Sequence, residues 1–428
     1  MKIVGLITEY NPFHNGHLYH IRESLRITGA DAALVVMSGD YVQRGTPAIM
    51  PKRLRTEMAL YCGAGAVLEL PVCYATGSAE FFALGAISLL DSLGIVDSVC
   101  FGSECSDLPL LQKIAGLLVD EPEQYREILR HELKLGKSFP AARQTAVVFC
   151  TGDPRCADIL KDPNNILGIE YLKALKKCGS SIRPYTIRRK GAGYHSSQLD
   201  ELYSSASAIR SLLAYSSSSI HTEFAGDDST ELSFSDILNE LGNQVPKKCL
   251  DLLSDFHKIQ YPVYQNDFSL ILKYKLLNKH PKSLVRYMDV SPELAARICT
   301  SLNDFFNYKQ FAGLLKTKEL TQTRINRALL HIMLGIKKDS VSEYMNSGYN
   351  FYARLLGFRK DCSQILTEIS KKSSLPLLTK LAESRELCEL GQRMLRDDIL
   401  ASNLYTSVVT DKFKTAFLNE YKQRIIKI

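Results

Sequence analysis

The sequence has no apolar run long enough to cross a lipid bilayer. A membrane-spanning helix needs roughly 18 or more consecutive apolar residues, and no run of that kind occurs among the 428 residues. The apolar opening, Met1–Ile7, is too short for the hydrophobic region of a secretory signal peptide and passes directly into polar residues. We therefore expect a cytoplasmic protein that has no membrane partner.

The cysteines lack the spacing of a metal site. None of the 11 forms a Cys-x-x-Cys pair, and the closest pairs, Cys100/Cys105 and Cys150/Cys156, have no histidine cluster beside them. Because structural zinc sites draw on clustered cysteines and histidines, we predict that the protein builds no metal site. Buried free thiols are the simpler interpretation.

Acidic residues are scarce in the second half of the chain. Residues 1–240 contain 23 Lys and Arg against 28 Asp and Glu, a net charge of −5, whereas residues 241–428 contain 30 against 18, a net charge of +12. Such an asymmetry indicates a polyanionic partner for the second half, and a solvated basic surface is the alternative. The length also exceeds that of one ordinary core and favours more than one domain.

The first hundred residues alternate between strand patterns and helix patterns. The predicted strands cover residues 2–8, 32–37, 66–70 and 98–101, and the predicted helices cover residues 15–27, 52–61 and 77–93. This order implies right-handed crossovers and a parallel sheet. We predict a doubly wound α/β fold, in which ligands bind beyond the carboxyl ends of the strands.

The rest of the chain is mostly helical in pattern. The predicted helices cover residues 108–149 (interrupted by a polar stretch), 164–175, 207–213, 268–277, 324–334 and 374–395, with one strand at 181–189 and a loop at 191–195. Residues 215–230 are rich in Ser and Asp and are the predicted linker. No alternating strand pattern occurs after about residue 232. We therefore predict an α/β domain at 1–231 and a mainly α-helical, basic domain at 232–428.

The strongest local feature is the segment Glu9–His17, Glu-Tyr-Asn-Pro-Phe-His-Asn-Gly-His, between the first predicted strand and helix. Main-chain N–H groups at a helix N-terminus favour an anion, and Gly16 allows close approach of the backbone to a ligand. His14 and His17 share one face of the first turn and can stabilise charge that develops on a phosphate. The alternative is a polar Asn-Gly turn with two exposed histidines.

Two motifs resemble the signatures of the nucleotidyltransferase superfamily. His14–His17 resembles its H-x-G-H signature, and Ser204–Arg210 resembles its second signature, I-S-S-T-x-I-R, with Ala206 and Ser207 departing from that pattern. In the second signature, hydroxyls cap a helix, where Ser205 or Ser207 could serve, and an arginine binds the ATP phosphates. The K-M-S-K-S signature of class I aminoacyl-tRNA synthetases is absent, which argues against that branch.

Longer segments resemble the bacterial tRNA(Met) cytidine acetate ligase family. They are Tyr10–His20, Val36–Gly45, Phe101–Glu104, Pro163–Gly168 and Tyr352–Phe358, so the resemblance covers most of the chain. It implies an enzyme that activates acetate with ATP as acetyl-adenylate. The acetyl group would then pass to the exocyclic amine of the wobble cytidine of elongator tRNA(Met).

These observations assign the site residues. His14 and His17 are the predicted catalytic residues. The resemblances imply ATP contacts from Ile7, Thr8, Glu9, Tyr10, Asn11, Pro12, Phe13, His14, Asn15, Gly16, His17, Leu18, Tyr19, His20, Gly102, Asn165, Arg188, Arg189 and Arg210. ATP is expected to come with Mg²⁺, although no carboxylate pair marks a metal site. Asp40 and Arg44 are weaker candidates for contacts to acetate or nucleotide.

The predicted nucleic-acid contacts lie in the basic half. Arg324 and Arg327 share a helix face, and Arg354 lies beside the aromatic Tyr352. Cations can follow the phosphates of tRNA while an aromatic ring stacks on an unpaired base. No protein partner is inferred from the sequence.

Two other functions remain open at this point. The protein could be an adenylyltransferase or ligase for a small metabolite carboxylate, or a catalytically silent RNA-binding protein with a vestigial nucleotide pocket. The basic second half favours nucleic acid over a metabolite, and the intact pair His14 and His17 disfavours the silent protein. The identity of acetate rests on the family resemblance alone.

Overall fold

The computed structural model describes residues 1–189, 205–215 and 233–428. Within them, an eight-stranded sheet has the strand order β10-β8-β5-β2-β1-β6-β7, with β9 beside β8. The strands are β1 (Ile3–Thr8), β2 (Ala32–Ser38), β5 (Ala66–Leu70), β6 (Ser98–Ser103), β7 (Arg183–Arg188), β8 (Ala353–Phe358), β9 (Leu377–Leu378) and β10 (Ile426–Lys427). Neighbours from β5 to β7 are parallel, which confirms the predicted doubly wound α/β fold.

Helices cover both faces of the sheet. Helices α1 (Asn15–Thr28) and α2 (Lys52–Tyr61) pack on the face that carries Val35, while α4 (Ala79–Ser92) and α9 (Pro163–Cys178) pack on the opposite face. Every residue of β2 and β5 is therefore buried. Burial on both faces explains the continuous apolar runs in these strands.

The order of the strands reverses beside β1. The chain moves outward on one side through β2 and β5, and β6 and β7 then lie on the other side of β1. A crevice forms at such a reversal, beyond the carboxyl ends of the strands. The turn that leads from β1 into α1, with its two histidines, therefore lies at the place where this fold binds ligands.

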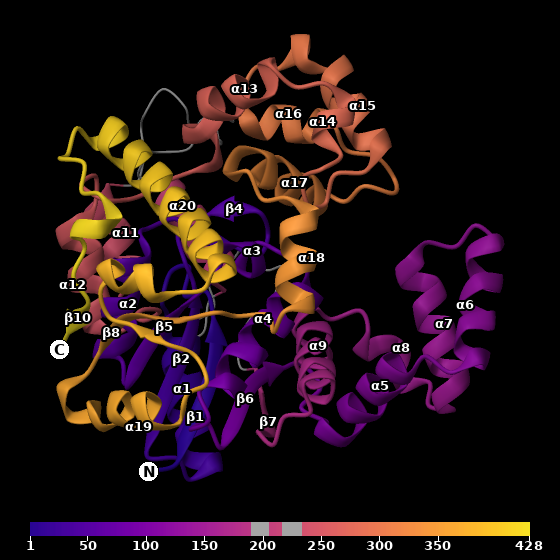
Figure 1. The fold of residues 1–428 in the computed structure, drawn as a ribbon, viewed down its shortest axis with the longest axis horizontal. Coiled ribbons are helices and arrows are strands. Elements are labelled where there is room, and N and C mark those ends of the chain that lie inside the picture. The colour runs from indigo at the N-terminus through magenta and orange to yellow at the C-terminus, as the bar shows by residue number, and fades with distance from the viewer. Residues whose placement is uncertain (190–204, 216–232) are drawn as a thin grey trace.

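A helical arm projects from the sheet between β6 and α9 (Figure 1). It consists of α5 (Leu108–Asp120), α6 (Glu123–Lys134), α7 (Phe139–Thr151) and α8 (Arg155–Ile159). The sequence predicted helices over this region, and the polar stretch that interrupts them lies between α5 and α6. The arm returns the chain to α9, whose N-terminal end faces the crevice beside β6.

Helices also dominate the chain after residue 232. They are α11 (Phe234–Leu241), α12 (Lys247–Phe256), α13 (Ser269–Leu277), α14 (Pro281–Leu284), α15 (Pro292–Thr300), α16 (Tyr308–Leu314), α17 (Gln322–Leu334), α18 (Lys338–Asn346), α19 (Gln364–Lys372) and α20 (Glu389–Phe413). Helices α13–α17 form a group beyond the small hairpin of β3 (Tyr41–Val42) and β4 (Thr46–Pro47) (Figure 1). None of the helices in the described ranges is long and apolar enough to cross a membrane.

Three strands follow residue 232, although the sequence shows no alternating strand pattern there. Strand β8 pairs antiparallel with β5 and parallel with β10, so the late chain returns to the edge of the sheet. All six residues of β8 are buried, and burial on both faces removes the alternation by which a strand is recognised. The predicted helix at 374–395 was wrong in its first part, which holds β9 and a 3₁₀ turn.

The boundary between 1–231 and 232–428 stays a prediction. The strands β8–β10 come from beyond it and join the sheet that the earlier strands build. The predicted loop at 191–195 and the predicted linker at 215–230 lie outside the described residues, apart from Tyr215 at the end of α10 (Ala206–Tyr215).

Candidate active site

A cavity of about 270 Å³ opens at the carboxyl ends of β1, β6 and β7. Its walls also include the first turns of α1 and α10, the start of α9 and the β3–β4 hairpin. Fourteen of the residues expected at an ATP site line it: Ile7, Thr8, Glu9, Tyr10, Asn11, His14, Gly16, His17, Tyr19, His20, Gly102, Arg188, Arg189 and Arg210. Residues that lie far apart in the sequence thus converge on one space.

The other expected ATP contacts lie off the cavity. Phe13 is fully buried in the core, and Leu18 packs against the same core cluster. Asn15 Nδ2 donates to the main-chain oxygen of Asn243 at 2.7 Å. Pro12 and Asn165 are also absent from the lining. None of these five side chains lines the cavity.

The His-x-Gly-His segment forms a reciprocal cap on α1. His14 Nδ1 accepts a hydrogen bond from the Gly16 amide at 3.0 Å, and His17 Nδ1 accepts one from the His14 amide at 3.3 Å. This is a capping box in which imidazole nitrogens replace the usual side-chain oxygens. A β-carbon on Gly16 would lie 2.8 Å from His14 Cε1. The spacing of the motif therefore follows from the geometry of the cap.

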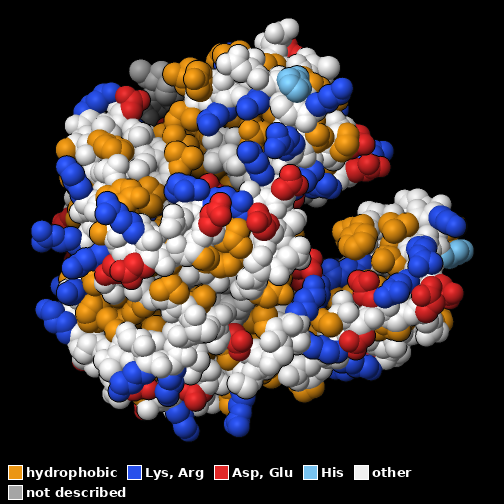
Figure 2. Space-filling model, viewed as in Figure 1, with side chains coloured by type: hydrophobic (Ala, Val, Ile, Leu, Met, Phe, Trp, Pro, Cys, Tyr) orange, Lys and Arg blue, Asp and Glu red, His pale blue; other side chains and the backbone are white. Residues whose placement is uncertain are grey.

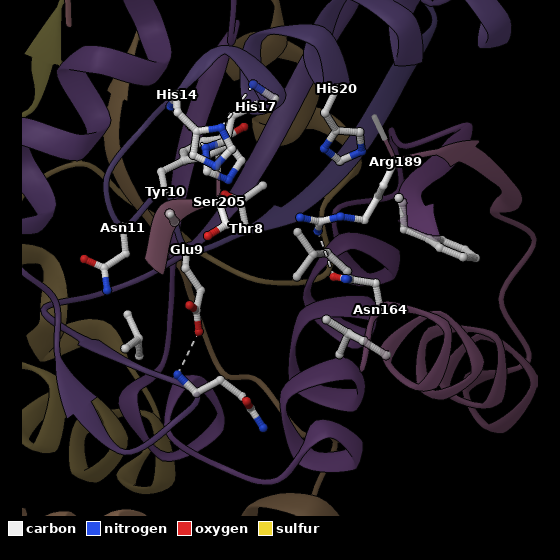
Figure 3. Close-up of a pocket in the computed structure, with 18 of the residues that line it drawn as sticks. Thr8, Glu9, Tyr10, Asn11, His14, His17, His20, Asn164, Arg189 and Ser205 are labelled. Carbon is white, nitrogen blue, oxygen red and sulfur yellow. Dashed lines mark hydrogen bonds between the residues drawn. The ribbon is translucent and has the colours of Figure 1, made fainter. Parts of the chain in front are cut away.

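The same bonds determine which ring nitrogen carries the proton. Because Nδ1 of both His14 and His17 accepts a main-chain N–H, each neutral ring carries its hydrogen on Nε2. The two ring centroids lie 3.8 Å apart, and Figure 3 shows the rings side by side. Tyr10 packs edge-on against His17, with centroids 4.9 Å apart. The pair offers two adjacent N–H donors in a cavity that both residues line.

Burial and nearby arginines keep the histidines neutral. Burial, followed by the charges of Arg189 and Arg210, lowers the pKa of His14 to about 3. Burial likewise lowers the pKa of His20 to about 4 and the pKa of His17 well below its usual value. A bound phosphate would offset the arginine charges and raise these pKa values. The charges of Arg189 and Arg210 thus make the cavity electropositive and suited to an anion.

Arg210 enters the cavity from α10. Its Nη1 donates to the Asn11 main-chain oxygen at 2.6 Å, and its Nη2 donates to Ser207 Oγ at 3.0 Å. Ser205 caps the helix, because its Oγ accepts a main-chain N–H of the first turn at 3.1 Å. Both hydroxyls therefore have a place in this variant of the second signature: Ser205 caps α10 and Ser207 orients Arg210.

Arg189 enters from the end of β7. Its Nη1 donates to Asn164 Oδ1 at 2.9 Å, and Figure 3 shows the two side chains together at one wall. A β-carbon on Gly102 would lie 3.1 Å from Arg189 Cγ, so this glycine leaves room for the arginine. Asn164 lines the cavity in place of the expected Asn165. The Asn165 side chain instead accepts two main-chain N–H groups of the loop after β6, at 2.9 and 3.1 Å.

The β3–β4 hairpin supplies a wall that the sequence interpretation largely missed. Gln43, Arg44 and Thr46 line the cavity, and of these only Arg44 was a candidate. The Gln43 amide donates to Glu9 Oε1 at 2.8 Å, and Gln43 Nε2 donates to the Gly77 main-chain oxygen at 3.2 Å. The segment Val36–Gly45, which resembles the ligase family, was the signal that could have identified these residues. The sequence did not show that Gln43 contacts Glu9 at the end of β1.

Asp40, the other weak candidate, is turned away from the cavity. It is 6% exposed, and its Oδ1 accepts a hydrogen bond from the Lys52 amide at 2.7 Å. Arg55, which the sequence did not single out, lies beneath the same loops. Its guanidinium donates to the main-chain oxygens of Glu9 at 2.6 Å and Ser38 at 3.1 Å. This buried arginine holds the end of β1 to the end of β2.

Arg354 was predicted to contact tRNA, and the structure corrects this assignment. Its side chain is 7% exposed in β8, where Nη1 lies 2.9 Å from Glu69 Oε2 and Nη2 pairs with Glu420. Lys52 Nζ joins the same network, 2.7 Å from Glu69 Oε1 and 2.8 Å from Glu420 Oε1. Removing Arg354 from this network would leave buried carboxylates without a partner. Its role is to bind the last residues of the chain to the sheet.

The two arginines of α17 differ in exposure. Arg324 is exposed, whereas the Arg327 side chain is 12% exposed and its Nε donates to Asp289 Oδ2 at 2.8 Å. Figure 2 shows Lys and Arg side chains gathered over helices α13–α17. The exposed ones there are Lys282, Arg286, Arg297, Lys309, Lys316, Lys318 and Arg324. This set, called the basic face below, is broader than the pair identified from the sequence.

The chain matches known proteins over nearly its whole length. A family model described as HIGH Nucleotidyl Transferase matches residues 1–420. A protein of Caldanaerobacter subterraneus subsp. tengcongensis named tRNA(Met) cytidine acetate ligase is 43% identical over 407 residues, which is 95% of each chain. The protein of that name from Acetivibrio thermocellus is 40% identical over 429 residues and 100% of each chain.

Two solved structures agree with these relatives. The crystal structure of apo Thermotoga maritima TmcAL has a TM-score of 0.90 with this chain, at 31% identity and 100% coverage of both chains. The TmcAL structure bound with alpha-thio ATP has a TM-score of 0.87, at the same identity and coverage. Since the sequence, the fold and the convergent motifs agree, the chain belongs to the HIGH nucleotidyl transferase family and, within it, to the tRNA(Met) cytidine acetate ligases.

Proposed function

We propose that the protein activates acetate with ATP as acetyl-adenylate and acetylates the exocyclic amine of the wobble cytidine of elongator tRNA(Met). The observation that carries this proposal is the convergence of His14, His17, Arg189 and Arg210 on one cavity at the reversal of strand order. Relatives that align with the full chain bear the corresponding name. A structural neighbour was solved with an ATP analogue.

In the first half-reaction, an acetate oxygen would attack the α-phosphorus of ATP. A bond forms between that oxygen and phosphorus, and the bond to the bridging oxygen breaks, so pyrophosphate leaves. The Nε2–H groups of His14 and His17 are placed to donate to the phosphate as its charge grows. Arg189 and Arg210 would neutralise the triphosphate through charge-assisted hydrogen bonds. No protein nucleophile is needed, so catalysis is positioning and charge stabilisation.

Mg²⁺ would enter as part of the substrate, bound to the triphosphate. The described residues contain no group of three or more His, Cys, Asp or Glu that could hold a metal ion. Mg²⁺ commonly binds substrate phosphates and water with few protein ligands. The charge stabilisation that the protein itself supplies would come from the histidines and arginines above.

The tRNA would dock on the basic face. The half of the chain that carries this face has a net charge of +12, whereas residues 1–240 have −5. A field of this size suits a macromolecular polyanion. The cytidine would have to leave the stack of the anticodon loop to reach the cavity. We further propose that residues 1–231 bind ATP, that residues 232–428 bind tRNA, and that the enzyme works in the cytoplasm with its tRNA.

The test is to incubate the protein with ATP, Mg²⁺, labelled acetate and total tRNA, and to identify the labelled nucleoside after digestion. Label in an acetylated cytidine of elongator tRNA(Met) is expected. Label in a small acyl product without tRNA would indicate a metabolite ligase. The absence of both label transfer and acetate-dependent pyrophosphate exchange would indicate a silent RNA-binding protein.

A further inference from the structure

Glu9 is an anion in a cavity that otherwise suits anions. Among the described residues that line the cavity, it carries the single carboxylate. Figure 3 shows its side chain extending away from the histidines and from Arg189, toward the opposite part of the hollow. A carboxylate repels a triphosphate, so an ATP contact leaves this residue unexplained.

The position of Glu9 is fixed at both ends. Its Oε1 accepts the Gln43 amide at 2.8 Å, and its main-chain oxygen accepts Arg55 Nη1 at 2.6 Å. Gln43 is itself held, because its Nε2 donates to the Gly77 main-chain oxygen at 3.2 Å. One carboxylate oxygen is thus anchored to the hairpin, and among the described residues no group forms a hydrogen bond or ion pair with the other oxygen.

In the second half-reaction, the acetyl group passes from acetyl-adenylate to the amine of cytidine. This step needs a fixed hydrogen-bond acceptor that can also take up a proton. The amine of cytosine is a weak nucleophile because its lone pair is delocalised into the ring, and it must lose a proton as it is acylated. Carboxylates recognise cytosine by accepting a hydrogen bond from this amine. They also act as general bases at a distance of one hydrogen bond. His14 and His17 cannot serve, since their Nδ1 atoms already accept main-chain N–H groups and their Nε2 atoms carry hydrogen.

We propose that Glu9 receives the cytidine amine of the tRNA and accepts its proton during acetyl transfer. The amine nitrogen forms a bond with the carbonyl carbon of acetyl-adenylate, and the bond from that carbon to the phosphate oxygen breaks. AMP leaves with the electron pair of that bond, and one amine proton passes to the Glu9 carboxylate. This assignment rests on the proposed function and adds a residue for its second step.

The experiment separates the two half-reactions in Glu9→Gln. Acetate-dependent exchange of pyrophosphate into ATP, without tRNA, measures the first. Single-turnover transfer from acetyl-adenylate to elongator tRNA(Met) measures the second. Transfer is expected to fall about 100-fold or more, the usual scale for a lost general base, while exchange falls much less. Glutamine can still accept an amine N–H, so the affinity for tRNA should change little.

Glu23→Gln is the matched control, because Glu23 lies on α1 and pairs with Arg26 at the surface. It should alter neither half-reaction. A loss of exchange as large as the loss of transfer in Glu9→Gln would overturn the assignment and place Glu9 at ATP activation. Normal transfer by Glu9→Gln would overturn it as well. If the wild-type protein itself acetylated no cytidine, the proposed function would fail first, so the two failures are distinguishable.

Discussion

Gly45, at the tip of the β3–β4 hairpin, lies directly against the backbone of Arg327 in α17. A β-carbon on Gly45 would lie 2.3 Å from the Arg327 amide nitrogen, and the φ of Gly45 is +76°. Its neighbours Gln43 and Arg44 line the cavity. The helix that carries part of the basic face therefore touches the wall that holds Glu9.

Substitution of Gly45 by alanine should disturb acetyl transfer more than the fold. The new β-carbon would meet rigid main chain, so the hairpin must shift away from α17 and carry Gln43 with it. A misplacement of about 1 Å can cost up to about 100-fold in rate, and we expect transfer to tRNA to fall between about 10- and 100-fold. Transfer would be measured in single turnover, and folding by thermal melting.

Gly335→Ala is the matched control for this substitution. Gly335 ends α17 with a φ of +83°, and no atom lies within 4 Å of its added β-carbon. Both variants carry the strain of a positive φ, but only Gly45→Ala adds a clash. Equal transfer rates in the two variants would show that the contact with Arg327 has no part in the reaction.

Removal of either histidine of the cap should abolish most ATP activation. For His14→Ala and for His17→Ala, we expect acetate-dependent pyrophosphate exchange to fall at least about 100-fold, the scale for losing a preorganised donor. Loss of the cap should also cost about 1 kcal/mol of stability, measured by urea unfolding. His131→Ala, at an exposed position on α6, serves as the control. Near-normal exchange in both variants would contradict the assignment.

Acid should destabilise the nucleotide-free protein in part through His14. Its pKa lies at about 3 in the folded protein, chiefly because it is buried, whereas an unfolded histidine titrates at about 6.5. Below about pH 6.5 the unfolded chain binds a proton that the folded chain does not. The contribution of neutral His14 to the free energy of unfolding is thus complete above about pH 6.5. It is lost as the pH falls toward about 3.

The variant His14→Asn tests this dependence. Between about pH 7 and about pH 5 it should lose less free energy of unfolding than the wild type, by on the order of 1–2 kcal/mol. Urea titrations at both pH values provide the measurement. Parallel losses in the two proteins would mean that His14 is not held neutral by the fold.

The two arginines of the cavity should control nucleotide affinity. Arg189→Ala or Arg210→Ala removes charge-assisted hydrogen bonds to phosphate, and calorimetry should show ATP binding weakened by about tenfold or more. Arg210→Lys should recover only part of this affinity, because lysine lacks the fork that reaches Asn11 and Ser207. Arg183→Ala, at the exposed opposite end of β7, is the control. Equal ATP affinities of Arg210→Ala and the wild type would show that Arg210 only supports the N-terminal cap of α10.

Reversal of charge on the basic face should weaken tRNA binding and leave the rate of acetyl-adenylate formation unchanged. Arg324→Glu combined with Lys316→Glu is expected to reduce the affinity for tRNA and to flatten its decline with salt, because fewer counterions are released. Arg327 is excluded from the variant because it pairs with Asp289. Filter binding at several salt concentrations gives both quantities.

Lys422→Glu with Arg424→Glu makes the same change of charge at exposed residues near the C-terminus, away from α13–α17 (Figure 1). This control should bind tRNA more tightly than the basic-face variant. Equal affinities of the two double variants, or an affinity that is independent of salt, would show that tRNA docks elsewhere.

The histidine motif could be predicted because its logic is local. His14, Gly16 and His17 lie within one helical turn, and the cap they form requires that spacing. The four longer strands and three longer helices of the first hundred residues were also predicted, since burial on both faces or on one face leaves a pattern in the order of residues. These features are set by neighbours within a few positions along the chain.

Other assignments failed or were missed because distant residues decide them. Arg354 looked like a surface cation beside an aromatic residue, and only its pairing with Glu69 and Glu420 shows that it is buried. Gln43 became important through a hydrogen bond to Glu9, which is 34 residues away. Asn164 lines the cavity, whereas the Asn165 side chain bonds the loop after β6, and only the folded chain distinguishes these neighbours.

The sequence by itself therefore determined the parallel α/β fold and the position of the turn between β1 and α1 that carries His14 and His17. The tertiary structure decided which cations face the cavity, which cation joins the buried network and which helix touches the hairpin. The physical reason is the separation along the chain between the residues whose contacts decide each feature. A cap or a strand pattern is settled within a few residues, whereas the contact of Gly45 with Arg327 depends on packing of elements that the chain order does not reveal.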